Sequence, residues 1–145
     1  MVEIHAENLN FWQTGQSSPD TWIERAKSQI IGLGGKIEGE GFGSNSEGKA
    51  AYMIGFSIEG NAFKVIWPVM KSKTNNQKAA KIQAATSLYH YVKTICLYAV
   101  VVGFRTAFFS HLMLPGGKIA SQIANEEIIK LIPEMLLYSD RKLLK

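Results

Sequence analysis

Apolar positions near the start of the chain follow a helical spacing. Ile23, Ala26 and Ile30 recur every three or four residues, which indicates one buried helix face. The preceding Ser18-Pro19-Asp20 supplies a capping hydroxyl, a proline suited to the first helical position and an acid in the first turn. The glycine-rich segment 32–35 then ends the pattern. A first helix is therefore predicted between Ser18 and this segment.

The next stretch alternates with a period of two residues. Glycine occupies every second position from Gly39 to Gly43, as in a strand with one bare side. A phosphate-binding glycine loop is the alternative interpretation. It is disfavoured because such a loop must lead into a helix, whereas a turn-like segment and another strand follow here. We interpret residues 36–43 as a strand.

Residues 51–71 give the clearest strand pattern and indicate a hairpin. With Gly60-Asn61 as a two-residue turn, the pattern pairs Ile58 with Phe63, Phe56 with Val65, Ile54 with Trp67 and Tyr52 with Val69 on one apolar side. Pro68 indicates that the last strand lies at an edge, because proline cannot donate to a sheet ladder. A three-stranded antiparallel sheet with helices on its apolar face is predicted.

A long helix follows, from about Asn76 to about Phe104. Its predicted apolar stripe is Ile82, Ala85, Leu88, Val92, Ile95, Cys96, Ala99 and Val102. Its predicted polar side is Gln83, Thr86, His90, Lys93 and Thr94. The uninterrupted apolar run 95–104 is too short to cross a bilayer, which needs about 20 residues. We therefore expect this run to be a buried helix segment.

The pattern as a whole predicts an α+β domain with the order helix, three strands, long helix. The α-β-β-β-α core spans 18–104, and a helical C-terminal extension spans 105–145 within one domain, 1–145. A break is expected near Gly103 and a turn at 114–118. Asn125 should cap a last helix that Pro133 bends or ends.

Charge is distributed unevenly along the chain. The formal net charge is +4, but residues 1–59 carry eight acids against four bases. Residues 60–125 carry eight bases and no acid, and residues 126–145 are balanced. A long acid-free stretch favours polyanionic partners. The alternative is that these lysines are ordinary solvated charges.

Lysines at the start of the long helix are the main candidate binding residues. A helix N-terminus carries partial positive charge, so Lys78 and Lys81 cost stability there unless an anion joins them. Converging lysines could bind successive phosphates without reading sequence. The predicted nucleic-acid-binding residues are Lys64, Lys71, Lys73, Lys78, Lys81, His90 and Lys93.

No pattern of residues supports catalysis or a bound metal. The histidines at 5, 90 and 111 are scattered, and none forms a spaced pair with an acid or a cysteine. The single cysteine, Cys96, lies on the apolar stripe, where a thiolate is disfavoured. Since no signal peptide is apparent either, we predict a cytoplasmic, non-enzymatic protein without cofactor, metal or membrane anchor.

The segment "QKAAKIQAATSL" resembles the second helix of the double-stranded-RNA-binding domain, and the likeness extends over residues 19–92. The matching positions are Lys78, Ala80, Lys81, Ala84, Ala85 and Leu88. Gln77 stands where that family has its first lysine, and the family's proline-histidine loop between the first two strands is absent. The resemblance implies the same α-β-β-β-α order and phosphate contacts by Lys78 and Lys81.

A second resemblance covers nearly the whole chain. The segments "PDTWIERAKSQIIGLGGKIEGEGFG", "AYMIGFSIEGNAFKVIWPV", "LYHYVKTICLYAVVVGF" and "SHLMLPGGKIASQI" look like successive blocks of a widespread, uncharacterised family of short bacterial and phage proteins. This resemblance implies the fold and a bacterial or phage origin rather than an activity. Val101, Val102, Ala107 and Phe108 lie where that family is usually acidic, which favours self-association here.

Three functional hypotheses follow. The first is a non-catalytic nucleic-acid-binding accessory protein that contacts DNA or RNA phosphates through the lysines. The alternative is a protein-interaction or homo-oligomeric module that uses the apolar C-terminal half. The third is a small-molecule-binding protein with an apolar pocket beside Gly39, Gly41 and Gly43.

Overall fold

The computed structural model describes residues 3–14, 17–115 and 118–120. In chain order the elements are a 3-10 helix η1 (Ala6–Asn8), α1 (Pro19–Gly32), β1 (Lys36–Ser44), β2 (Ala50–Ile58), β3 (Asn61–Val69), α2 (Gln77–Val102), a short α3 (Phe104–Ala107) and a 3-10 helix η2 (Phe109–His111). The predicted α+β class and the α-β-β-β-α order are confirmed.

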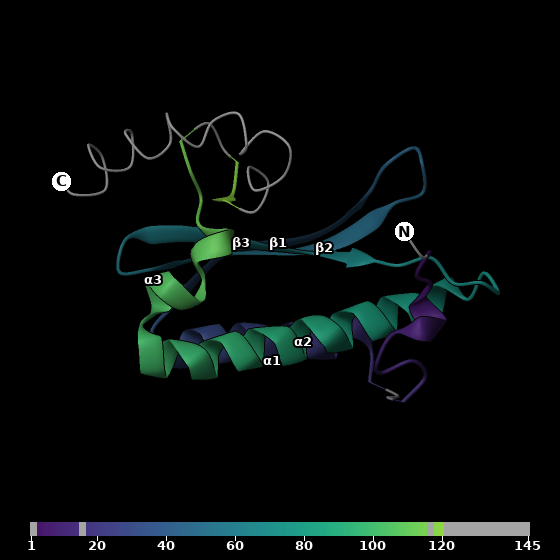
Figure 1. The fold of residues 1–145 in the computed structure, drawn as a ribbon, viewed down its shortest axis with the longest axis horizontal. Coiled ribbons are helices and arrows are strands. Elements are labelled where there is room, and N and C mark those ends of the chain that lie inside the picture. Colours follow the sequence, from purple (N-terminus) through teal and green to yellow (C-terminus); the bar gives the residue numbers. More distant parts are fainter. Residues whose placement is uncertain (1–2, 15–16, 116–117, 121–145) are drawn as a thin grey trace.

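The elements form two layers (Figure 1). One layer is an antiparallel sheet with the strand order β1-β2-β3. The other contains α1 and α2, which pack side by side beneath the same face of the sheet. β3 is an edge strand, as Pro68 predicted. The sheet therefore keeps one face and two edges away from the helices.

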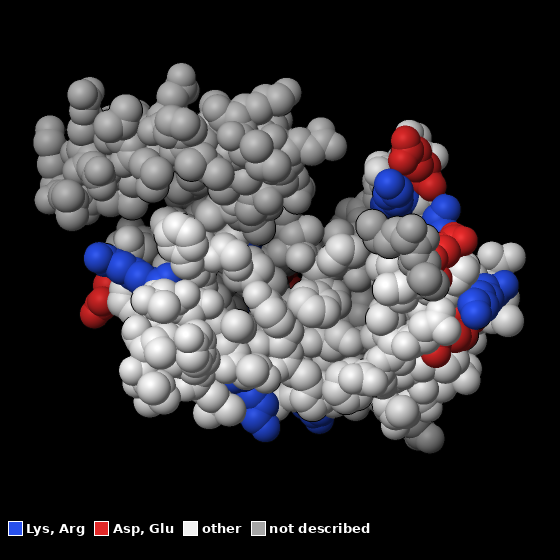
Figure 2. Space-filling view, viewed as in Figure 1, with Lys and Arg blue, Asp and Glu red and all other residues white. Residues whose placement is uncertain are grey.

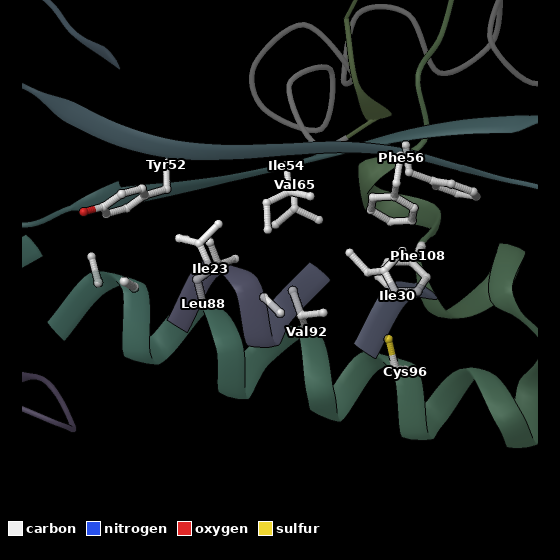
Figure 3. Close-up of a cluster of buried hydrophobic side chains, with 14 of the residues drawn as sticks. Ile23, Ile30, Tyr52, Ile54, Phe56, Val65, Leu88, Val92, Cys96 and Phe108 are labelled. Carbon is white, nitrogen blue, oxygen red and sulfur yellow. The ribbon is translucent and has the colours of Figure 1, made fainter. Parts of the chain in front are cut away.

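The core fills the space between the two layers (Figure 3). Ile54 and Val65 point down from the sheet, while Ile30, Leu88 and Val92 rise from the helices, and all five are fully buried. Each such side chain contributes about 1.5–3 kcal/mol through burial. Ser18 caps α1 as predicted, because its side-chain oxygen accepts the backbone N–H of Thr21.

The hairpin turn lies one residue earlier than the sequence pattern suggested. β2 ends at Ile58 and β3 begins at Asn61, so Glu59-Gly60 forms the turn. The observed pairs are therefore Ile58 with Asn61, Phe56 with Phe63, Ile54 with Val65, Tyr52 with Trp67 and Ala50 with Val69. Both turn residues have positive φ, 49° for Glu59 and 83° for Gly60, as a tight turn matching the strand twist requires. The predicted inward-facing set is unchanged.

The predicted polar side of α2 is wrong at two positions. Gln83 and Thr86 are buried, with 2% and 3% of their surface exposed. Gln83 lies under the N-terminal segment, where its Nε2 donates to the Asn10 carbonyl at 2.8 Å. The Thr86 hydroxyl donates to the Ile82 carbonyl at 2.7 Å. Because the sheet, α1 and the N-terminal segment all contact α2, its first half is buried beyond a single stripe.

The predicted burial of the apolar run 95–104 is wrong for four of its large side chains. Leu97, Tyr98, Val100 and Val101 are all more than half exposed. α2 has 26 residues and α1 has 14, so at 1.5 Å per residue α2 is about 18 Å longer. Near its start, however, α1 packs beside the middle of α2, where Trp22 contacts Tyr89 and His90. The end of α1 reaches Leu97 and Val100, which share a groove with Gly32. The extra length of α2 therefore lies mainly before α1, and the exposed side chains lie on sides of α2 that neither α1 nor the sheet covers.

The chain turns back toward the sheet after α2. Gly103, with φ 91°, ends the helix where the break was predicted. Beyond α3 and η2, Leu112 bridges Phe63 in antiparallel fashion, and Met113 donates its backbone N–H to the Ala62 carbonyl at 2.9 Å. The predicted turn at 114–118 is closed by a hydrogen bond from the Leu114 N–H to the Lys118 carbonyl. The predicted last helix at Asn125 and Pro133 lies outside the described residues.

Candidate nucleic-acid interface

Three of the predicted lysines surround the start of α2. Lys71 and Lys73 lie in the loop that leads into the helix, and Lys78 lies in its first turn; all three are exposed. Asn76 caps the helix, since its side-chain oxygen accepts the Ala79 N–H at 3.2 Å. The chain thus satisfies one of the N-terminal donors itself, while the ammonium groups face solvent.

A carboxylate of the same protein already binds in the loop before α2. Glu7, from η1, accepts the Ser72 hydroxyl at 2.6 Å, the Lys73 backbone N–H at 2.9 Å and the Thr74 hydroxyl at 3.3 Å. Partial desolvation acts to raise the pKa of Glu7, but these hydrogen bonds together lower it from 4.5 to about 2. Glu7, which lies outside the acid-free stretch, therefore already occupies the hydrogen-bond donors of this loop that could bind a phosphate.

Lys81 packs on the sheet instead of projecting freely. Its Nζ lies 4.9 Å from the centre of the Phe42 ring, at a distance typical of a cation–π contact. The Phe42 ring in turn lies 4.8 Å from the Tyr52 ring. Lys81 is half-buried and links α2 to β1 and β2. The Lys81 ammonium therefore already contacts the Phe42 ring within the protein itself.

His90 and Lys93 lie further along α2. The His90 ring stacks on Phe11 with a centroid distance of 4.5 Å and an angle of 7°, and Trp22 lies 6.0 Å away. Arg25 lies 4.7 Å from the centre of the Trp22 ring. Lys93 is exposed. Sequence reasoning missed this aromatic cluster and its arginine, because Phe11, Trp22 and His90 come from three separate segments.

Lys64 is separated from the other predicted residues by the sheet. It pairs with Gly55 across β2 and β3 and belongs to the alternate set of side chains that points away from the helices. The structure therefore brings Lys71, Lys73 and Lys78 together, and leaves Lys64, Lys81 and Lys93 apart from them.

Figure 2 shows the same dispersion on one face of the molecule. Lysines and arginines lie around the rim in separate groups, several of them next to aspartates or glutamates, and the centre of the face is uncharged. On this face no single positive area extends from the helix start across the molecule.

Several apolar side chains near the end of α2 are exposed, although the sequence pattern predicted that they would be buried. We name Leu97, Tyr98, Val100 and Val101 the apolar end of α2. Their exposed fractions are 62%, 51%, 76% and 82%. Leu97 and Val100 also line a shallow groove of about 290 Å³, shared with Gly32 of α1 and with Leu33, which follows it. The sequence signal was the run 95–104 itself, which carries no charged residue.

A second groove lies between β3, α2 and the N-terminal segment. It has a volume of about 450 Å³. Its walls include Phe11, Trp67, Pro68 and Met70, and Gln83 and Ser87 from α2 also line it. The sequence could not reveal it, because its lining comes from three segments. None of the four grooves described in this structure is lined by Gly39, Gly41 or Gly43.

Reactive groups are sparse in the described part of the chain. No three His, Cys, Asp or Glu side chains among these residues are placed to hold a metal ion. Burial raises the pKa of the Cys96 thiol to about 11, which disfavours a nucleophilic thiolate at neutral pH. The absence of catalysis stays a prediction.

One described helix, α2, is long and apolar enough to cross a membrane by length and composition. The core helices of soluble proteins pass the same test. The predicted lack of a membrane partner therefore stays a prediction.

No protein-family model, curated protein or solved structure matches this chain. The two family resemblances, the bacterial or phage origin and the cytoplasmic location remain predictions from the sequence.

Proposed function

We propose that this chain is a non-catalytic interaction module that self-associates through the apolar end of α2. The main support is the exposure of Leu97, Val100 and Val101, which recur at i, i+3 and i+4 and thus share one side of the helix. Contiguous exposed apolar surface on a soluble protein commonly marks a contact site.

Helix stability alone does not explain why valines occupy these exposed positions of α2. Valine is a poor helix former because its branched side chain loses rotamer freedom against the preceding turn. Val100 and Val101 nevertheless lie in the last turn of α2 with at least three quarters of their surface in solvent. Covering them would remove this apolar area from water at about 25 cal/mol per Å².

A second copy of the chain is the partner that fits this surface most simply. In a two-fold dimer the same patch meets itself, and the apolar end of α2 contains no charge that would oppose its own copy. Lys93 and Arg105 flank it. Salt should therefore leave self-association unchanged or strengthen it, because screening reduces repulsion between these flanking charges.

Light scattering and sedimentation velocity over a concentration series test this proposal. The wild type should form a discrete oligomer, and Val100→Glu with Val101→Glu should be monomeric. Ile4→Glu is the matched control, because Ile4 is a half-exposed aliphatic residue outside α2 and its loss should leave the oligomer intact. A wild type that stays monomeric at every concentration would overturn the proposal. So would a monomer that binds neutral phospholipid vesicles, since the apolar end would then contact lipid.

Nucleic-acid binding is a second proposal, with one specific observation in its favour. Lys71, Lys73 and Lys78 are exposed around the start of α2, where helix dipole and ammonium groups act in the same direction. Glu7 offsets part of this charge. The salt dependence separates the two proposals, because phosphate binding weakens steeply as salt rises.

A further inference from the structure

The free edge of β3 has backbone groups that no described residue satisfies. Because Ile58 and Asn61 flank a two-residue turn, they form a hydrogen-bonded pair, and such pairs alternate along an antiparallel ladder. Ala62, Lys64, Ile66 and Pro68 therefore direct their backbone groups away from β2. The bond from Met113 to the Ala62 carbonyl confirms this direction.

Part of this edge is already used by the chain itself. Residues 112–113 lie along it beside Ala62 and Phe63, and the backbone of Lys64 interacts with the His111 ring. Pro68 has no N–H. Among the described residues, none bonds the outward N–H and C=O of Ile66. The edge thus accepts an extended segment at one end and remains open at the centre.

The groove of about 450 Å³ lies beside this open part of the edge. Trp67 belongs to the side-chain set that faces the helices, and it forms one wall. In a strand added to β3, the residue opposite Trp67 would point to the same side. Its side chain would therefore enter the groove, where Phe11, Pro68 and Met70 offer apolar contacts.

The groove is held in shape without a ligand. Gln83 is 2% exposed, and its Nε2 donates both to the Asn10 carbonyl and to the Ser87 hydroxyl, each at 2.8 Å. Phe11 has φ 72°, a conformation that is strained for a bulky residue. Its stacking on His90 at 4.5 Å compensates. Strain retained at a surface groove is typical of binding sites.

Positively charged side chains near the edge favour an acidic partner. Lys64 and Lys71 lie at the two ends of its open part, and residues 60–120 contain no acid. The exposed Glu3 lies near Lys71, because both line a groove at the end of β3, so the positive charge is least opposed at Lys64. The nearby Glu7 carboxylate is engaged by Ser72, Lys73 and Thr74. An extended ligand with carboxylates on the side of Lys64 would meet favourable charge.

We propose that the free edge of β3 binds an acidic peptide in extended form, which pairs with Ile66 and inserts an apolar side chain beside Trp67. This is the strand-addition mode, in which backbone hydrogen bonds supply affinity and alternate side-chain pockets supply specificity. The site lies near Gln83 and Ser87, more than two helical turns from the apolar end of α2. It does not depend on self-association.

The probe is a fluorescent pool of short peptides with glutamate at alternate positions and mixed leucine and phenylalanine between them. A matched pool carries lysine in place of glutamate. Fluorescence anisotropy should show saturable binding of the glutamate pool and at least about tenfold weaker binding of the lysine pool. The monomeric Val100→Glu, Val101→Glu variant should bind equally well, so failure of the self-association proposal would leave this result unaffected.

Ile66→Pro removes the outward N–H and preserves the ladder to β2, as Pro68 does naturally. It should weaken binding by about tenfold, whereas Ile66→Val should not. If Ile66→Pro does not fold, backbone N-methylation of the glutamate peptides gives a second readout and should cause a similar loss. No binding of the glutamate pool, equal binding of the lysine pool, or binding that is insensitive to both backbone changes would overturn the proposal.

Discussion

Lys73 donates its backbone N–H to the Glu7 carboxylate at 2.9 Å, across 66 positions of sequence. The same carboxylate accepts the Ser72 and Thr74 hydroxyls. One residue of the acidic N-terminal part thereby fixes the loop before α2 and places a negative charge beside the segment that carries Lys71 and Lys73. Glu7 is remote from this loop in the sequence, but the fold brings its negative charge to the predicted phosphate site.

Glu7→Gln should destabilise the protein at neutral pH, because a neutral amide accepts these hydrogen bonds less strongly than a carboxylate. The pKa of Glu7 is lowered from 4.5 to about 2, so its stabilisation is fully present above pH 4.5. It is lost as the pH falls from 4.5 toward 2. Thermal melts of the wild type and Glu7→Gln should therefore differ at pH 7 and converge near pH 2.

Glu3→Gln is the control for that comparison. The Glu3 side chain is 85% exposed and contacts only His5 among the ion pairs of the described residues. Its loss should leave the melting temperature nearly unchanged. Equal effects of the two substitutions would contradict the role given to Glu7.

If the protein binds nucleic acid, Lys78→Glu with Lys81→Glu should abolish binding in a low-salt anisotropy titration. The two charge reversals place four units of negative charge, relative to the wild type, at the helix start. Glu7→Gln should strengthen binding, because it removes the nearby competing anion. Lys64→Glu is a useful control, since Lys64 lies on the other side of the sheet. A titration of single- and double-stranded DNA and RNA that shows no binding would exclude this function.

Most of the fold could be predicted because each element carries a local signal. The Ser18-Pro19-Asp20 start of α1, the alternation in the strands and the break at Gly103 all depend on neighbouring residues. The register between β2 and β3 could not be predicted from such local signals. Turns at Glu59-Gly60 and at Gly60-Asn61 place the same apolar residues inward, so hydrophobic alternation cannot distinguish them. The structure places the turn at Glu59-Gly60, where both residues have positive φ.

The candidate site was less predictable because it depends on which segments meet. Gln83 and Thr86 read as polar surface, yet the N-terminal segment and α1 bury them. Val100 and Val101 were expected in the core, yet they lie on sides of α2 that neither α1 nor the sheet covers. Such differences arise from the relative lengths and placement of elements, and no residue spacing within α2 records them.

Glu59→Asn should stabilise the hairpin. Glu59 has φ 49°, a left-handed conformation that costs most residues about 1–2 kcal/mol and that asparagine tolerates better. Asn-Gly is also the preferred sequence for this turn. Chemical unfolding should show a gain of roughly 0.5–1 kcal/mol. Asn61→Gly is the comparison, because the turn at Gly60-Asn61 would predict a gain there instead. A gain for Asn61→Gly and none for Glu59→Asn would contradict the observed register.

His111 should make the protein less stable in mild acid. It is buried at 9% exposure, and its Nε2 contacts the Tyr91 hydroxyl on α2. Burial lowers the pKa of His111 from 6.5, and an interaction with the Lys64 backbone partly opposes this shift. The folded protein therefore favours the neutral ring, so the associated stability is present above pH 6.5 and is lost as the pH falls below it.

Denaturant unfolding at pH 7.5 and pH 5.5 tests this dependence, in a range where Glu7 remains ionised. The wild type should lose stability between the two values, and His111→Phe, which fills the same space without titrating, should lose less. His90→Phe is the control, because it removes the histidine of α2 and leaves His111 in place. This variant should retain the wild-type dependence of stability on pH. An unchanged pH dependence in His111→Phe would show that His111 is not the titrating group.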